Sequence, residues 1–243
     1  MNAFAGPVLS IDCSQRRSVL ALSRAAGEAP FVRAFAAVGG SGDSAREAFW
    51  DELRALEAES GVAARELRGV AVALGPGGFT GLRVAIACAK GVAYALGVPA
   101  AGLRSSEVFA ASHAQAAGLR EARVAVLLAS KNGSAFVAEV VVDHAGMAVE
   151  ERSEVLGPAE LAAALAARPP MVALSDEHLA AELAEVLANR RIAVEPITTD
   201  GASLDRLARL ALAEHRADPF ALLPIYPREP EAVTNWRARK SMA

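Results

Sequence analysis

The segment Gly69–Leu74 (GVAVAL) constrains the fold of this chain more than any other. It is an uninterrupted apolar run, which is typical of a strand buried on both faces of a parallel sheet. It leads into the glycine-rich sequence GPGGFTG (residues 75–81), and an apolar helical segment follows at about Leu82–Leu96. A short strand is then predicted at Val98–Gly102. Because strand, helix and parallel strand join by a right-handed crossover, we predict a mixed sheet covered by helices.

The same order of elements is predicted in both halves of the chain. In the first half, three short strands precede a helix that begins near Ser44, where Ser44 and Glu47 have capping-box spacing. These strands are predicted at Val8–Ile11, Ser18–Ser23 and Phe31–Ala36. In the second half, a helix and three strands precede alternating helices and strands, with elements predicted at Ser106–Ala117, Ala122–Ser130, Gly133–Val142, Ala148–Val155, Pro158–Ala167, Met171–Ser175, Glu177–Asn189, Ile192–Pro196 and Leu204–Arg216. We therefore predict an α/β protein with two related halves.

The composition narrows the class of protein. The chain carries 25 Lys and Arg against 28 Asp and Glu, so it lacks the basic excess of proteins that bind nucleic acid alone. Its longest uncharged stretch, Gly69–Leu82, is too short to span a membrane. The N-terminus has no signal-peptide pattern, and the two cysteines, Cys13 and Cys88, are far apart in the sequence. We expect a soluble, cytoplasmic protein with two free thiols.

The glycine-rich loop is a candidate phosphate site. Glycines permit a tight turn, and the following helix would direct its free N–H groups and the positive end of its dipole at an anion. Asp12, at the end of the first strand, could hold a metal–phosphate group. The candidate residues are Asp12, Gly75, Gly77, Gly78, Thr80 and Gly81.

A structural interpretation of the same residues stays open. A Walker A loop needs Lys followed by Ser or Thr where Leu82 and Arg83 stand, and a dinucleotide loop needs glycine at Thr80. The loop could therefore be a strand-to-helix turn without a ligand. Asp12 could accept backbone N–H bonds in an Asx turn.

The first two helices are a candidate protein–protein interface. The helix at Leu82–Leu96 is apolar all round, so it must be covered on more than one face. Small residues would let a partner helix approach closely, and Trp50 stands off the apolar stripe of the preceding helix, on the face of its arginines. Interfaces are enriched in Trp and Arg. The candidate interface residues are Trp50, Arg46, Arg54, Arg83, Ala85, Ala89 and Ala93.

Patterns for a metal site or a nucleophile are absent from the sequence. The four histidines are far apart, and neither HExxH nor HxxxH occurs. A GxSxG nucleophile motif is missing as well. We therefore predict no catalytic and no metal-ligating residues.

Four segments together resemble one known family. Val8–Ser14 (VLSIDCS) resembles the family's opening LAIDTS, and Ala73–Val84 (ALGPGGFTGLRV) resembles its GPGSFTGLRIG block. Lys90–Gly91 with Val98–Pro99 resembles the continuation AKGLA…P, and Pro224–Arg228 (PIYPR) resembles a late PxYLR segment. The chain is thus similar to the TsaB (YeaZ) family.

This resemblance implies an actin/sugar-kinase/Hsp70-type (ASKHA) fold of two ribonuclease-H-like lobes, with mixed sheets flanked by helices. We predict an N-terminal lobe at residues 1–103 that is joined by a C-terminal helix at 203–228. The second lobe is predicted at 104–202 and a tail at 229–243. Members of the family pair through the first two helices of the N-terminal lobe, where Trp50 and the apolar helix stand.

The resemblance also implies a role in placing threonylcarbamoyl on adenosine 37 of tRNAs that read codons beginning with A. In that machinery the TsaD protein is the catalytic, metal-bearing subunit, TsaB-like proteins are its non-catalytic partners, and the ATPase TsaE joins them. We therefore expect a scaffold subunit that has no cofactor of its own, with ATP or ADP at the interface of the complex. We also expect self-association of the isolated chain, and contact with tRNA only through the partners.

Two alternative functions stay open. The chain could be an ATP-dependent phosphotransferase of the same fold, with Asp12 and the loop at residues 75–81 holding the nucleotide. A glycoprotease-like hydrolase is the other alternative, although it would need metal ligands that the sequence lacks.

Overall fold

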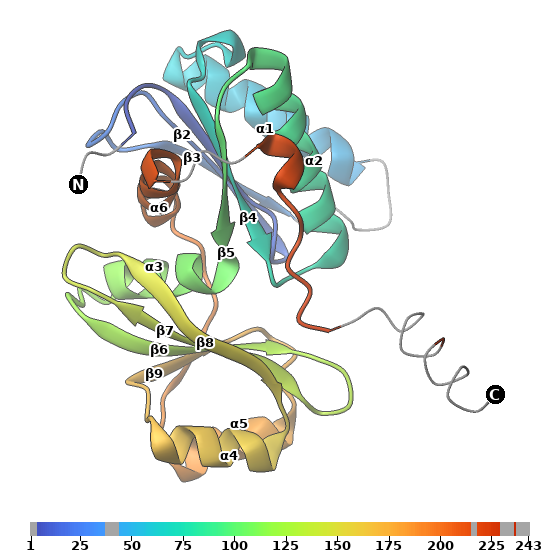
Figure 1. Ribbon diagram of the computed structural model, residues 1–243, viewed down its shortest axis with the longest axis vertical. Coiled ribbons are helices and arrows are strands. Elements are labelled where there is room, and N and C mark those ends of the chain that lie inside the picture. The colour runs from blue at the N-terminus through green and yellow to red at the C-terminus, as the bar shows by residue number, and fades with distance from the viewer. Residues whose placement is uncertain (1–3, 37–43, 215–217, 229–235, 237–243) are drawn as a thin grey trace.

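The computed structural model describes residues 4–36, 44–214, 218–228 and 236. The side chains of residues 44–47, Arg46 among them, and the predicted tail at 229–243 apart from Trp236 lie outside the described part. Two lobes lie one above the other, each built on its own sheet, with helices between the sheets (Figure 1).

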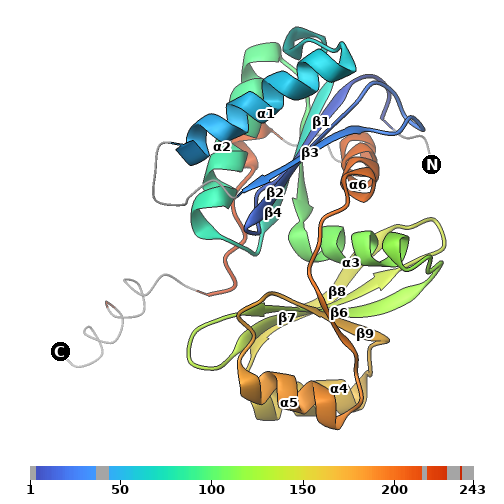
Figure 2. The ribbon, with the colours of Figure 1, turned by 180° about the vertical axis from the view of Figure 1, so that it is seen from behind.

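The N-terminal lobe is built on a five-stranded sheet in the order β3-β2-β1-β4-β5. Its strands are β1 (Val8–Asp12), β2 (Arg17–Ser23), β3 (Phe31–Ala36), β4 (Gly69–Gly75) and β5 (Ala100–Arg104). β1, β2 and β3 pair antiparallel, whereas β4 lies parallel to both β1 and β5. Helices α1 (Ser44–Ser60) and α2 (Phe79–Leu96) cover one face, and α6 (Gly201–Glu214) covers the other (Figure 2). A short 3-10 helix, η1 (Ala64–Glu66), precedes β4.

The second lobe is built on a five-stranded sheet in the order β10-β9-β6-β7-β8. Its strands are β6 (Ala122–Ala129), β7 (Ala135–Val142), β8 (Ala148–Leu156), β9 (Val172–Ser175) and β10 (Val194–Pro196). Helix α3 (Ser105–Ala116) lies on the inner face of this sheet. Helices α4 (Pro158–Ala167) and α5 (Ala181–Asn189) lie on the outer face (Figure 1).

The two halves share one topology. Each half runs through three antiparallel strands, a helix, a strand, a helix, a strand and a final helix. The two sheets match strand for strand when the second is read from β8 to β10. The predicted fold class is therefore confirmed: two ribonuclease-H-like lobes with mixed sheets, in the arrangement of the ASKHA fold.

A shared apolar layer joins the lobes. Helices α3 and α6 lie between the sheets, and the cluster that they form includes residues of both, such as Val8 of β1 and Val124 of β6. Phe109 of α3 is fully buried in this layer. Separate clusters lie under α1 and α2 in one lobe and under α4 and α5 in the other. Because the central layer draws on both halves, the predicted boundary between residues 103 and 104 stays a prediction.

Helix α5 and the C-terminal helix depart most from their predicted bounds. Helix α5 begins at Ala181 and not at Glu177, because the Asp176 carboxylate accepts the N–H groups of His178 and Ala129 and holds this segment in a turn. Of the C-terminal helix predicted at 203–228, the structure describes α6 over Gly201–Glu214, and residues 222–228 are not helical. We call residues 219–228 the strap; it begins with the 3-10 helix η2 (Pro219–Ala221).

The strap runs along α2 and then crosses to the second lobe (Figure 1). The Ile225 N–H donates to the Leu74 carbonyl at the end of β4, at 2.8 Å. Arg228 donates to the carbonyl of Lys131 at 3.3 Å, in the turn between β6 and β7. The strap therefore connects the two lobes on the side of α2.

Candidate functional site

The glycine-rich loop fits tightly against the turn between β1 and β2. A Cβ atom on Gly81 would lie 2.2 Å from the Cys13 carbonyl oxygen, and one on Gly77 would lie 2.3 Å from the Ser14 carbonyl oxygen. Gly75 has φ of 105°, a backbone conformation that favours glycine. These three glycines therefore have a structural reason that involves no ligand.

The N–H groups of the loop are partly used within the protein. The Gly78 N–H donates to the Ser14 carbonyl at 2.7 Å, so the loop is closed by the β1–β2 turn. A Cβ atom on Gly78 would lie at an ordinary distance of 3.6 Å from the same oxygen. Thr80 is exposed in the first turn of α2, which begins at Phe79 and not at Leu82 as predicted. The loop thus has the geometry of a strand-to-helix turn.

Asp12 is buried, and both of its carboxylate oxygens accept hydrogen bonds. One oxygen accepts from the Ser14 N–H at 2.9 Å, which is the Asx turn that the sequence offers as an alternative. The other accepts from the Thr199 hydroxyl at 2.7 Å, just before α6. Asp12 therefore ties the β1–β2 turn to the segment that returns from the second lobe.

Further contacts cross between the lobes beside Asp12. Arg16, in the β1–β2 turn, forms an ion pair with Glu177 at 2.8 Å and a hydrogen bond with His178 at 3.1 Å. Both partners follow β9 of the second lobe. Together with the Asp12–Thr199 hydrogen bond, these contacts link the end of β1 and the β1–β2 turn to segments of the second lobe and to the chain returning from it.

Trp50 and Arg54 lie on the outer surface of α1, as an interface would require. The Trp50 side chain is 46% exposed, and its ring packs edge-on against the buried ring of Phe49 with centroids 5.3 Å apart. Arg54 is exposed and forms an ion pair with Asp51 at 2.8 Å. Packing against Phe49 restricts the indole, so it presents a preformed apolar surface.

The prediction that Ala85, Ala89 and Ala93 face a partner is wrong. All three are buried against the N-terminal sheet, together with Leu82 and Ile86. These five residues form a single stripe at helical spacing, and their small members let α2 lie close to the sheet. The exposed side of α2 also has small residues, Thr80, Ala87, Gly91 and Ala95, and these lie beside the larger Arg83 and Tyr94. The sequence offers two small faces on this helix, and the interface prediction names the inward one.

Arg83 belongs to an aromatic cluster that the sequence does not reveal. Its guanidinium lies over the Phe79 ring at 3.7 Å, and its Nε donates to the Tyr226 hydroxyl at 2.8 Å. Tyr226 comes from the strap, 143 residues further along the chain. This pairing depends on how the strap returns to α2, and no local pattern signals it.

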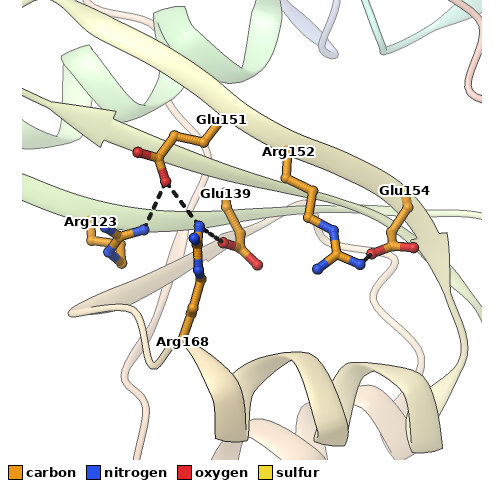
Figure 3. A network of polar contacts seen from close by, with 6 residues as sticks. All are labelled: Arg123, Glu139, Glu151, Arg152, Glu154 and Arg168. Atoms are coloured by element: carbon orange, nitrogen blue, oxygen red, sulfur yellow. Dashed lines mark hydrogen bonds and ion pairs between the residues drawn. The ribbon is translucent and has the colours of Figure 1, made fainter.

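The outer face of the second lobe carries a network of ion pairs (Figure 3). The network consists of Arg123, Glu139, Glu151, Arg152, Glu154 and Arg168. Arg168, which follows α4, bonds to Glu151 at 3.2 Å and lies 3.6 Å from Glu139. A small pocket beside it is lined by Leu161 and Leu165 of α4. Because the charges pair with one another, the network fastens the end of α4 to the sheet.

Cys13 is buried and Cys88 is half-buried, and burial raises the pKa of both thiols. Burial raises the pKa of Cys13 to about 12, where a hydrogen bond with Ser18 lowers it and the nearby Asp12 raises it. Burial also raises the pKa of Cys88 to about 11. Within the part of the chain that the structure describes, no three His, Cys, Asp or Glu side chains are grouped so that they could hold a metal ion.

We expect the native thiols to react slowly with Ellman's reagent at pH 8. Because burial raises the pKa of Cys88, its thiolate fraction falls about a hundredfold below that of a free cysteine. The thiolate fraction of Cys13 is lower still, because its pKa is raised further. Unfolding in guanidinium chloride should release both thiols to rapid reaction. Fast labelling of Cys88 in the native protein would show that this thiol is more accessible than its burial implies.

The fold and the packing of the glycine-rich loop define the class of protein. This is a two-lobed α/β protein of the ASKHA type whose glycine-rich loop is packed onto its own β1–β2 turn. The family model of TsaD, described as tRNA N6-adenosine threonylcarbamoyltransferase, matches residues 45–196. The chain belongs to this family.

Solved structures confirm the predicted similarity to the YeaZ fold. YeaZ from Pseudomonas aeruginosa has a TM-score of 0.72 at 20% sequence identity, over 91% of this chain and 99% of that chain. A second Pseudomonas aeruginosa protein, described as similar to the peptidase YeaZ, has a TM-score of 0.73 at 20% identity, over 92% and 100% of the two chains. No curated protein matches this chain in a sequence comparison.

By length and composition, α2 is the described helix that would also suit a membrane span. In the structure it connects β4 to β5 and buries one face on the N-terminal sheet. This is the position of a core helix in an α/β lobe.

Proposed function

We propose that this chain is a cytoplasmic, non-catalytic partner of a TsaD-like catalytic subunit, in the machinery that adds threonylcarbamoyl to adenosine 37 of tRNAs that read codons beginning with A. A TsaE-like ATPase would join the two. The observation that carries the proposal is the surface of α1 and α2, where Trp50 and the small residues Ala87 and Gly91 are exposed. These residues are not part of the core of the lobe, to which the opposite faces of the two helices contribute.

The chemistry of the chain supports a partner role over a catalytic one. The family's transferase subunit bears a metal, and this sequence contains no HxxxH pair that could hold it. The described residues also offer no cluster of three potential ligands. The residues present therefore do not fit the metal, and we derive no reaction step through it.

The surface of α1 and α2 supports pairing with another helical face. Trp50 is a rigid apolar anchor of the kind that interfaces favour. On α2, Ala87 and Gly91 are exposed one turn apart, so the backbone of a partner helix could come close there. The same face would serve self-association of the isolated chain.

The phosphotransferase alternative has less support. Both oxygens of Asp12 and the N–H of Gly78 are already bound within the protein. Binding of ATP or ADP at the interface of the complex stays a prediction. Calorimetry with the isolated chain and with the complex would distinguish a nucleotide site within this chain from a site formed only in the complex.

Trp50→Ala and Ala87→Glu should each abolish co-purification with the TsaD-like subunit. The first removes the anchor, and the second places a charge where a partner helix would pack. Both side chains are exposed, so the melting temperature of the isolated chain should change little. Met171→Glu, at an exposed apolar residue of the second lobe, is the matched control and should bind normally. Retained binding by both interface variants would contradict the proposed interface.

A further inference from the structure

An exposed aromatic surface lies where the strap runs along α2. Its rings are Phe79 and Tyr94 of α2 and Phe220 and Tyr226 of the strap, which include both tyrosines of the chain. Tyr94 is 72% exposed, Phe220 63% and Phe79 56%, although aromatic residues make up only 5% of the sequence. We call these four rings, with Arg83 and Lys90, the strap surface. Phe79 and Tyr94 lie near opposite ends of α2, about 22 Å apart along the helix, so the surface is elongated. Large exposed apolar groups along one surface mark binding sites.

The rings of the strap surface are held in two pairs, each with a cation. Tyr94 and Phe220 pack edge-to-face with centroids 5.5 Å apart, and Lys90 Nζ lies 3.3 Å from the Phe220 carbonyl oxygen. Phe79 and Tyr226 lie 5.6 Å apart, with the Arg83 guanidinium over the first and bonded to the hydroxyl of the second. Their orientations are therefore set before any ligand arrives.

The charge of this surface is opposite to that of the whole chain. The full sequence has a formal net charge of -3, whereas neither α2 nor the strap contains an Asp or Glu, and the Asp218 carboxylate directly before the strap accepts the Phe220 N–H at 2.9 Å. Their charged residues are Arg83, Lys90 and Arg228, all cations. An anionic ligand with flat rings complements such a surface, because bases stack on aromatic side chains and phosphates pair with Lys and Arg.

We propose that the strap surface binds unpaired RNA, with bases stacked on Tyr94 and Phe220 and phosphates near Arg83 and Lys90. This goes beyond the proposed function, because it requires no partner subunit. It also replaces the expectation that the chain contacts tRNA only through its partners. The overall charge does not reveal this surface, because the charged residues within α2 and the strap are all cations.

Unpaired RNA fits this surface better than a protein partner does. A protein interface centres on apolar groups with few charges at its core. Here each ring pair has a cation at its side. On the α2 face proposed for the TsaD-like subunit, Ala87 and Gly91 are small and uncharged. Arg83, one turn before Ala87, borders that face and is engaged with Phe79 and Tyr226. Double-stranded RNA keeps its bases stacked inside, so it offers no free base to these rings.

Fluorescence anisotropy of the isolated full chain with labelled oligouridine tests the proposal. Wild type should bind the single strand and bind a labelled RNA duplex of equal length much more weakly. Tyr94→Ala and Phe220→Ala should each weaken binding about tenfold, as expected for the loss of one stacked base. Lys90→Gln should flatten the dependence of affinity on salt. Met171→Ala, at an exposed apolar residue away from the strap, should bind as wild type does.

The outcomes separate this proposal from the previous one. Failure of wild type to bind oligouridine at low salt would overturn it, and so would unchanged binding by both ring variants. Equal binding of duplex and single strand would also overturn it. If the ring variants lost the TsaD-like subunit while wild type bound no RNA, the strap surface would be a protein interface. Because anisotropy uses the chain alone, its result does not depend on complex formation.

Discussion

Replacing Arg209 by alanine should destabilise the protein by about 3–5 kcal/mol, because it leaves the carboxylate of Asp205 buried without its counterion. The two side chains are 3% and 7% exposed, and Arg209 Nε lies 3.0 Å from Asp205 Oδ2. Arg209 also donates to the carbonyls of Phe4 and Gly6, at 2.7 and 3.1 Å, and Ser23 of β2 bonds to both members of the pair. The pair therefore fastens α6 to the N-terminal sheet.

Denaturant unfolding of a small set of variants measures this effect. Arg54→Ala, which breaks the exposed ion pair with Asp51, should cost at most about 1 kcal/mol. The double variant with Asp205→Leu and Arg209→Met removes both charges, and it should recover part of the stability that Arg209→Ala loses. If Arg209→Ala cost no more than Arg54→Ala, α6 would be held mainly by its apolar contacts.

Gly81→Ala should destabilise the fold by about 1–3 kcal/mol or more, because the new methyl group has no room. It would lie 2.2 Å from the Cys13 carbonyl oxygen, which is backbone and cannot rotate away. Either α2 or the β1–β2 turn must move, and the Gly78–Ser14 hydrogen bond links the two. We therefore expect lower thermal stability together with weaker amide protection around Ser14.

Two other glycines provide matched controls for Gly81→Ala. Gly91 lies in the same helix with nothing within 4 Å of its Cβ position, so Gly91→Ala should stabilise the protein by about 0.5–1 kcal/mol. Gly78→Ser restores the residue usual in the resembling family, and it meets only an ordinary contact of 3.6 Å. Equal stability of the Gly81 and Gly91 variants would show that the loop is not packed as tightly as described.

Periodicity along the chain predicted most of the fold. The apolar run at residues 69–74 became β4, and the strand at Phe31–Ala36 and the helix at Pro158–Ala167 have the predicted bounds. These elements follow from local repeats of apolar residues, with a period of two residues in strands and 3.6 residues in helices, which are visible in the sequence itself. The glycine loop was located from sequence for the same reason, because its composition and its place between strand and helix are local features.

The rest of the candidate site depends on contacts between distant segments. Asp12 is bonded to Thr199, and Arg83 to Tyr226, across more than half of the chain. The buried face of α2 could not be chosen from its small residues, since Ala and Gly occur on both faces. Packing on the sheet selects the face with Leu82 and Ile86, because these larger side chains gain most from burial.

Reconstitution of the tRNA modification tests the central claim most directly. Threonylcarbamoyladenosine formation would be measured by mass spectrometry with a TsaD-like subunit and a TsaE-like ATPase held constant, and this chain present, absent or replaced by Trp50→Ala. We predict product only when the wild-type chain is added, and little or none with the variant. Full product without this chain would contradict the account, and so would product formed by this chain alone.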